Sequence, residues 1–263
     1  MSENAFLRPS VLRMKTRHDG QKTVVDEVYF TSPLKVLPPV YLPDQTAQIF
    51  VLAASAGILA GDVQEFSLRV GKDCRLELTG QSYEKIHPMP TGKASRHCEV
   101  VVEQNAFLFY NPLPVLPFAD SAFESTMTFH LLDNSAKLIL VDILACGRAA
   151  RNERFAFRSY RSLVEIYTKG QLVFRDNACY FPQKMLLEKV GLFEGYSHFA
   201  NMVVCNCNLA AEQLQAMREI LQAESGIQSG ISVLHSGDRV IKLLGSSGQQ
   251  LTDVCQRMCA YIR

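Results

Sequence analysis

The sequence predicts a mainly β protein of stacked β-hairpins, or β-helix-like layered sheets, with two α-helices near the C-terminus. Three observations predict this fold class: a strand-turn-strand pattern that recurs about every 30 residues, period-two alternation of apolar and polar residues beside each turn, and two amphipathic segments near the end of the chain. Units repeated at such a period bury their apolar faces against one another.

The recurring pattern consists of an apolar residue, three mostly polar residues, a small residue and then a leucine two positions later. Its four copies are VGKDCRLEL (70–78), VEQNAFLFY (102–110), LDNSAKLIL (132–140) and IYTKGQLVF (166–174). We interpret each polar triplet as a turn and its flanks as strands, so that each copy is one hairpin or rung. The segment AQIFVLA (47–53) reads as a degenerate earlier copy.

The end of the chain has a different pattern. Residues 209–223 have the apolar spacing of an amphipathic helix, residues 232–245 read as a hairpin, and residues 249–262 form a second helix. We expect a single domain over residues 1–263, with a β-rich body from about 20 to 205 and a helix-hairpin-helix portion from about 206 to 263.

Composition excludes several classes of protein. A net charge of +1 gives no field for binding nucleic acid. Apolar runs fall short of the roughly 20 residues of a membrane helix, and the N-terminus lacks the pattern of a secretory signal, so we expect a cytoplasmic protein with no membrane partner. Its eight cysteines then stay reduced and pack as small apolar residues, with a structural zinc site as the alternative.

Two aspartates have unusual positions in the predicted strands. Asp142 and Asp176 follow the repeat leucines at even spacing, which places both carboxylates on the predicted buried side. A buried carboxylate is costly unless it is paired or hydrated. Ordinary salt bridges to the nearby Arg148 and Arg175 would explain them, and the alternative is a polar interior passage.

Other chemistry-bearing motifs are sparse. The segment SAGILAGD (55–62) has two glycines that shape a turn and present Asp62. His87 beside Glu84 offers a possible transient metal site, and His198 beside Glu194 offers a second. Neither a GxSxG nucleophile motif nor a phosphate-binding loop occurs, so we expect no catalytic residues and no tightly bound cofactor.

Five segments occur in the order and spacing of a known family. They are SAGILAGD, TGQSYEKIHPM, NAFLFYNPLPVLPF, DILACGRAARNERF and LVEIYTKGQLVFRDN. On these segments the chain resembles the urease accessory protein family UreD, named UreH in some bacteria, and is closest to the UreH branch. The resemblance runs from about residue 28 to 205, and the last 60 residues match only in their strand and helix layout.

The resemblance implies a non-catalytic scaffold that joins UreF-type and UreG-type accessory proteins on the urease apoprotein and helps to deliver nickel. It also implies a hydrated interior passage for transient Ni²⁺, in which Asp62 and Asp142 match acidic positions of the family. Family members often have Glu at the second of these positions. To these two we add Asp176, from the parity of the repeat, and Glu84.

Two other functions remain open from the sequence. A metal-dependent hydrolase would use paired carboxylates and a tightly held metal. A pure docking scaffold would use its aspartates only structurally, with no metal path. The sequence does not determine the oligomeric state, the nickel affinity or the surface that binds each partner.

Overall fold

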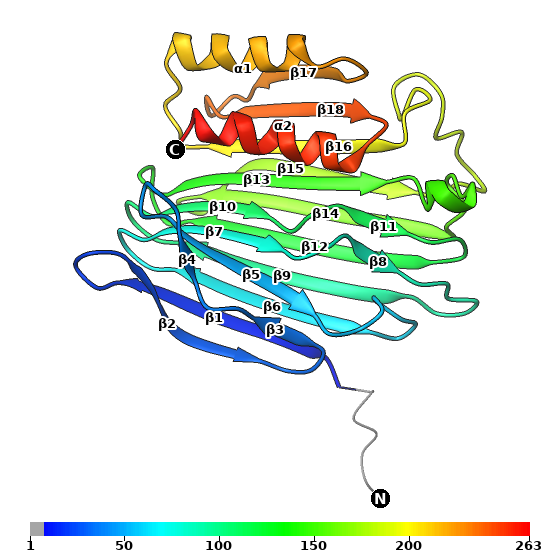
Figure 1. The fold of residues 1–263 in the computed structure, drawn as a ribbon, viewed down its shortest axis with the longest axis horizontal. Helices are drawn as coiled ribbons and strands as arrows, with labels where there is room; N and C mark the ends of the chain where they lie inside the picture. The colour runs from blue at the N-terminus through cyan, green and yellow to red at the C-terminus, as the bar shows by residue number, and fades with distance from the viewer. Residues whose placement is uncertain (1–7) are drawn as a thin grey trace, which may run out of the picture.

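The computed structural model describes residues 8–263 and consists of two β-sheets that lie face to face, with two helices on one of them. In Figure 1 the strands run roughly across the view, and successive strands of both layers follow one another from β2 (Thr23–Phe30) to β17 (Gln228–Val233). The predicted fold class, layered β-helix-like sheets with two helices near the C-terminus, is confirmed.

The first sheet, sheet A, has seven strands in the order β15-β14-β12-β9-β6-β1-β2. Their bounds are β1 Ser10–His18, β2 Thr23–Phe30, β6 Val63–Val70, β9 Ala94–Val102, β12 Ala122–Leu131, β14 Ser159–Thr168 and β15 Gln171–Tyr180. Strands β1, β6, β9, β12 and β14 are parallel, whereas β2 and β15 pair antiparallel at the two edges.

The second sheet, sheet B, has eight strands in the order β17-β18-β16-β13-β10-β7-β5-β3, and three short strands pair beside this path. The main strands are β3 Leu34–Val36, β5 Ala47–Ala53, β7 Arg75–Gly80, β10 Phe107–Asn111, β13 Lys137–Ala145, β16 His198–Cys205, β17 Gln228–Val233 and β18 Arg239–Gly245. The short strands are β4 Val40–Tyr41, β8 Glu84–Ile86 and β11 Val115–Pro117. A short 3₁₀ helix covers Ala149–Arg151.

The repeat in the sequence builds the rungs that join the two sheets. In each of its first three copies a strand of sheet A turns a corner into a strand of sheet B, and Leu76, Leu108 and Leu138 lie side by side in register. The small residues at the corners are fully buried, because each corner stacks on the next. The N–H of Phe107, for example, donates to the carbonyl of Cys74 at 2.8 Å. The AQIFVLA segment is β5, which joins the same row.

The fourth copy of the repeat has a different geometry. Lys169 and Gly170 both have positive φ, at 51° and 78°, which suits a two-residue hairpin turn. Strands β14 and β15 therefore pair antiparallel within sheet A, and no corner leads into sheet B. Leu172 is 48% exposed as a result. The expectation that Leu172 is buried like the other three repeat leucines is therefore wrong.

Two apolar clusters fill the space between the sheets. The corner cluster contains the repeat leucines and their neighbours on sheet A, such as Cys98, Met127 and Val164. The distal cluster lies toward the other ends of the strands and contains residues such as Phe123 and Leu144. A third cluster packs the helices against the outer face of sheet B.

The C-terminal portion continues sheet B. Strands β16, β18 and β17 extend it antiparallel, and the helices α1 (Ala211–Ala223) and α2 (Gly248–Ala260) lie beside them, as Figure 1 shows. Ser247 begins α2, and its hydroxyl accepts the N–H of Gln250. The predicted helix, hairpin and helix are confirmed here. No helix among residues 8–263 has the length and apolarity needed to cross a membrane.

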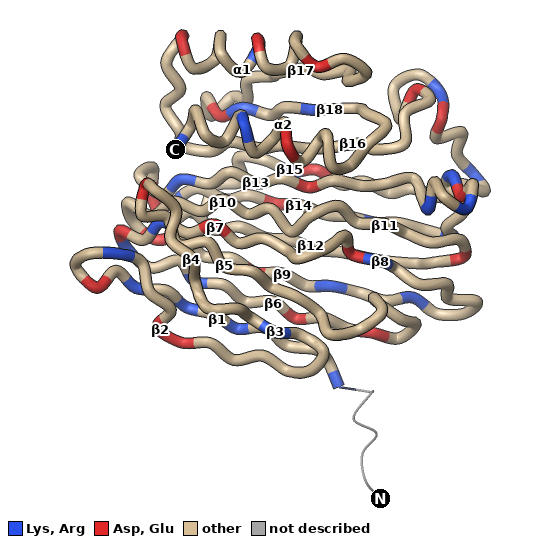
Figure 2. The backbone as a smooth tube through the Cα atoms, viewed as in Figure 1, with Lys and Arg blue, Asp and Glu red and all other residues tan. Residues whose placement is uncertain are grey.

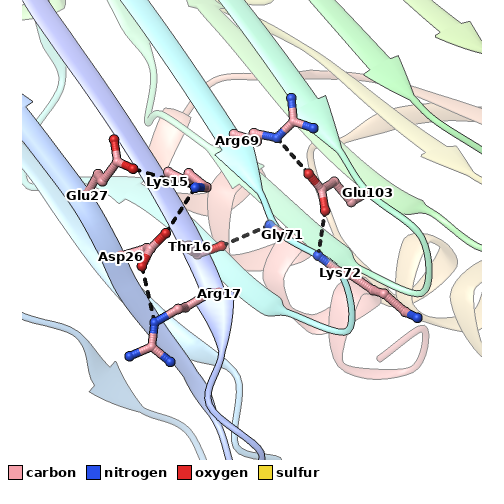
Figure 3. A network of polar contacts seen from close by, with 9 residues as sticks. All are labelled: Lys15, Thr16, Arg17, Asp26, Glu27, Arg69, Gly71, Lys72 and Glu103. Carbon is pink, nitrogen blue, oxygen red and sulfur yellow. Dashed lines mark hydrogen bonds and ion pairs between the residues drawn. The ribbon is translucent and has the colours of Figure 1, made fainter.

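Charged residues are scattered along the chain, many of them at strand ends and in loops (Figure 2). Few charged side chains are buried. Figure 3 shows one network of charged side chains, in which Lys15 and Arg17 of β1 pair with Asp26 of β2. In the same view Glu103 bridges Arg69 and the N–H of Lys72, which fixes a corner. Against this background, charge in the interior is conspicuous.

Candidate functional site

A layer of polar side chains separates the two inner apolar clusters. Along β9 the inward-facing residues are Ala94 of the distal cluster, then Arg96, then Cys98 of the corner cluster. The same interruption recurs on other strands of both sheets. We call these residues the polar layer: Gln64, Glu84, Arg96, Ser125, Asp142, Ser162, Asp176, Asn201 and Lys242.

Strand register aligns the part of the layer that belongs to sheet A. Gln64 pairs with Arg96, Arg96 with Ser125, and Ser125 with Ser162, across the strands β6, β9, β12 and β14. All four residues are buried. Since parallel strands in register place equivalent side chains side by side, the four form one row on the inner face.

Sheet B contributes a second row. Asp142 of β13 pairs with Asn201 of β16, which pairs with Lys242 of β18. Asp142 lies between Leu140 of the corner cluster and Leu144 of the distal cluster. Its predicted inward orientation is thus observed.

Arg96 and Glu84 form the ion pair at one end of the layer. A guanidinium nitrogen of Arg96 lies 2.5 Å from a carboxylate oxygen of Glu84, and its Nε donates to the amide oxygen of Gln64 at 2.9 Å. Burial opposes the charge on Arg96, but Glu84 outweighs it and keeps the pKa of the guanidinium above its ordinary value. This end of the layer is therefore permanently charged.

A cleft opens beside this ion pair. It has a volume of about 120 Å³, several times the roughly 10–15 Å³ that one water needs. Its walls come from both sheets and include Glu84, Arg96 and Tyr110, and the loop segment Ser55–Gly57 also lines it. Solvent thus reaches one end of the polar layer.

Asp142 has the most perturbed carboxyl group of the layer. Burial and the neighbouring charge of Asp176 raise its pKa to about 6, although Arg96 and a hydrogen bond with Ser162 act in the opposite direction. Burial, with both carboxylates adding to it, also raises the pKa of Tyr180 to about 12. Burial is thus the main cause of the raised pKa of Asp142, and the charge of Asp176 adds to it.

Asp176 lies at the other end of the layer, on the edge strand β15. One of its carboxylate oxygens is 3.7 Å from Nζ of Lys242, which reaches across from β18. The Lys242 side chain is 54% exposed and that of Asp176 27%. This ion pair therefore meets solvent at the edge of the two sheets opposite the cleft.

Asp62 lies apart from this group. Its Oδ2 accepts the N–H of Leu59 at 2.8 Å, within the turn that precedes β6. Among residues 8–263 no hydrogen bond or ion pair joins Asp62 to Arg96 or Asp142. The glycines of SAGILAGD therefore do not aim this carboxylate into the layer, since the turn itself takes it as an acceptor. Its part in a metal path stays a prediction.

The first half of SAGILAGD has a different place in the site. Gly57 has φ of +144°, and a Cβ on it would lie 2.4 Å from the carbonyl oxygen of Lys85. Ile58 forms an isolated parallel bridge with Ile86. Glycine is thus required for the loop to dock on β8, where Ser55–Gly57 lines the cleft.

The arginines that were expected to neutralise the aspartates pair elsewhere. Arg148 binds Glu153, and Arg175 binds Glu165 on the outer face of sheet A. The salt-bridge interpretation is therefore wrong for these two arginines. Inside the protein, Lys242 pairs with Asp176, and the charge of Arg96, which itself pairs with Glu84, acts on Asp142. Both cations lie far from the aspartates in the sequence.

Neither histidine joins the expected carboxylate. Nε2 of His87 is 2.9 Å from the carbonyl of Ala56. Nδ1 of His198 is 2.8 Å from the hydroxyl of Ser197, and burial lowers the pKa of His198 to about 4. Within the described part of the chain no group of three or more His, Cys, Asp or Glu residues is arranged to hold a metal ion.

The sequence patterns did not indicate the other six residues of the polar layer, which are Gln64, Arg96, Ser125, Ser162, Asn201 and Lys242. The parity argument that selected Asp142 also applies to Arg96, which shares the side of Cys98 and Val100 on its strand. Pairing between strands remote in sequence, such as β13 with β16, is what brings these residues together.

A family model described as UreD urease accessory protein matches residues 9–263. The chain belongs to this family. The match extends well beyond the 28–205 range of the recognised segments and includes the C-terminal helices.

Individual relatives in the family cover nearly the whole chain. The urease accessory protein UreH of Helicobacter pylori (strain G27) is 34% identical over 257 residues, which are 97% of this chain and 95% of the relative. UreH of Helicobacter hepaticus is 36% identical, covering 94% and 96%. UreD of Acetivibrio thermocellus is 35% identical and covers 96% of each. Relatives under both family names thus have similar identity to the chain.

Proposed function

We propose that this chain is a non-catalytic urease maturation factor. In this proposal it joins UreF-type and UreG-type accessory proteins on the urease apoprotein, and its polar layer helps Ni²⁺ pass toward the urease active site. Membership of the urease accessory family supports the role in maturation. The polar layer, with Asp142 and Asp176 between two apolar clusters, is the observation that carries the nickel path.

The composition of the layer suits transit better than storage. Ni²⁺ stands high in the affinity order of divalent metals, so a closed set of thiolates or imidazoles would retain it. The layer offers carboxylate, amide and hydroxyl oxygens instead. Burial raises the pKa of the Cys98 thiol near the layer, which keeps it protonated and a poor ligand.

Both ends of the layer have access to solvent. Glu84 and Arg96 border the cleft at one end, and Asp176 with Lys242 lies half-exposed at the other. We propose that a hydrated ion enters at one of these ends, meets Asp142 in the interior and leaves at the other.

The test is nickel loading of urease in cells that express it with this protein. Asp142→Asn and Asp176→Asn, alone and together, keep the side-chain size but remove the charges. We expect a lower nickel content per urease active site and lower urease activity, while pull-down of the UreF-type and UreG-type proteins stays unchanged. Glu27→Gln, a change on the outer face of sheet A, is the control.

The same experiment separates the alternatives. Full nickel loading of urease with the double variant would indicate a pure docking scaffold with no metal path. A metal-dependent hydrolase predicts that the purified protein keeps about one metal ion per chain after dialysis, which elemental analysis measures. Among the described residues, no group of three or more His, Cys, Asp or Glu side chains is placed to hold such a metal tightly.

A further inference from the structure

Asn201 is a buried acceptor without a partner. Its side chain lies on the inner face of sheet B, it is 5% exposed, and its Oδ1 makes no hydrogen bond. Buried amide oxygens are almost always bonded, and leaving one unbonded costs folding free energy. An unpaired oxygen here therefore suggests that something else binds it.

The neighbours of Asn201 in its row carry opposite charges. Asp142 precedes it on β13 and Lys242 follows it on β18, and paired residues of adjacent strands place their Cβ atoms about 4.5–5.5 Å apart. Asp176 of sheet A faces the same place, because its charge acts on Asp142 and its carboxylate pairs with Lys242. Three oxygen-bearing side chains thus converge with one flexible cation.

We propose that Asp142, Asn201 and Asp176 form a three-oxygen site for a divalent cation at the β15–β18 end of the polar layer, and that Lys242 is the tethered cation which that ion displaces. This inference rests on the proposed function and assigns a binding site to one of the two solvent-exposed ends of the nickel path. Two carboxylates and an amide oxygen neutralise a divalent ion and leave positions for water, as hard and borderline cations accept.

Lys242 fits the role of a competitor. At 3.7 Å its ammonium is at the long end of an ion pair, and more than half of its side chain is exposed, so it can swing into solvent without becoming desolvated. When the ammonium returns, it repels the metal ion and forms its ion pair with Asp176 again. This competition keeps the affinity of the site for the metal low, so that the ion can be released.

The inference is tested by equilibrium dialysis of the full chain against Ni²⁺ alone. Lys242→Met keeps the length of the side chain and removes its charge, and we expect about fivefold tighter Ni²⁺ binding, the upper end of what a half-exposed ion pair contributes. Lys35→Met, an exposed lysine on the opposite edge strand β3, is the control and leaves the affinity unchanged. Adding Asp176→Asn to Lys242→Met cancels the gain.

Asn201 has its own pair of variants. Asn201→Leu removes the oxygen and weakens Ni²⁺ binding, and Asn201→Asp adds a charge and strengthens it, so that one informative variant remains if the other fails to fold. Unchanged affinity in Lys242→Met, or in Asn201→Asp, overturns the inference.

The outcome also distinguishes the inference from the proposed function. If the Lys242 and Asn201 variants bind Ni²⁺ as the wild type does while Asp142→Asn lowers nickel loading of urease, only the three-oxygen site is wrong. If Asp142→Asn together with Asp176→Asn leaves urease fully loaded, the nickel path itself is wrong.

Discussion

Arg96 and Glu84, which come from different sheets, form an ion pair at 2.5 Å in which the arginine side chain is only 7% exposed. The pair lies at one end of the polar layer and borders the cleft between the sheets. Breaking a buried pair leaves an uncompensated charge, which costs more than the intact pair contributes. The stability of the sandwich therefore depends on both partners.

Replacing this arginine should be costly. We expect Arg96→Met to lower the free energy of unfolding by about 3 kcal/mol, since Glu84 and Gln64 lose their partner. The control is Arg69→Met, which breaks the exposed pair with Glu103 seen in Figure 3 and should cost less than about 1 kcal/mol. Urea denaturation of both variants measures the difference, and equal losses would contradict the buried role of Arg96.

Asp142 should make stability depend on pH in a direction unusual for an aspartate. Its pKa is raised from 3.8 to about 6 on folding, so the folded protein binds this proton more tightly than the unfolded chain does. The contribution of Asp142 to stability therefore falls as pH rises from about 4 to about 6, by up to about 3 kcal/mol.

The Asp142→Asn variant lacks the titrating carboxyl group, so its stability should lose this dependence on pH. Its free energy of unfolding should exceed that of the wild type at pH 7 and approach it near pH 4. Denaturation curves between pH 4 and 7 measure the difference in free energy of unfolding between the variant and the wild type. A difference that does not change with pH would contradict the raised pKa of Asp142.

Gly57 should tolerate no side chain. In Gly57→Ala the new Cβ meets the carbonyl oxygen of Lys85, and φ of +144° adds strain. We therefore expect the free energy of unfolding to fall by about 2 kcal/mol or more. Gly61→Ala is the matched control within the same loop, because it has positive φ but open space around it. It should cost only about 1 kcal/mol. Thermal denaturation of both proteins makes the comparison.

Asp62 should act through its acceptor oxygen. Asp62→Ala removes the hydrogen bond to the N–H of Leu59 and should cost about 1 kcal/mol, whereas Asp62→Asn keeps an acceptor and should be nearly neutral. Nickel loading of urease by Asp62→Asn then isolates the charge. Reduced nickel loading at unchanged stability would support a role of Asp62 in the metal path. Normal nickel loading would indicate that Asp62 only stabilises the turn.

The sequence by itself determined the rungs and the C-terminal elements. Leu76, Leu108 and Leu138 repeat because each packs on the next copy of the same corner, so a local pattern contains the information for that part of the fold. The helices α1 and α2 were also predictable, since an amphipathic period is a local property. The inward orientation of Asp142 followed from strand parity alone.

Only the tertiary structure decided which polar groups meet. Asp142 has Asn201 and Lys242 as neighbours because β13, β16 and β18 pair in sheet B, and Asp176 faces them because a two-residue turn keeps β15 in sheet A. Strand order and sheet-to-sheet facing depend on the packing of the whole chain rather than on local periodicity. For the same reason the sequence suggested Arg148 and Arg175 as partners of the aspartates, whereas the fold pairs Lys242 with Asp176 and brings the charge of Arg96 to bear on Asp142.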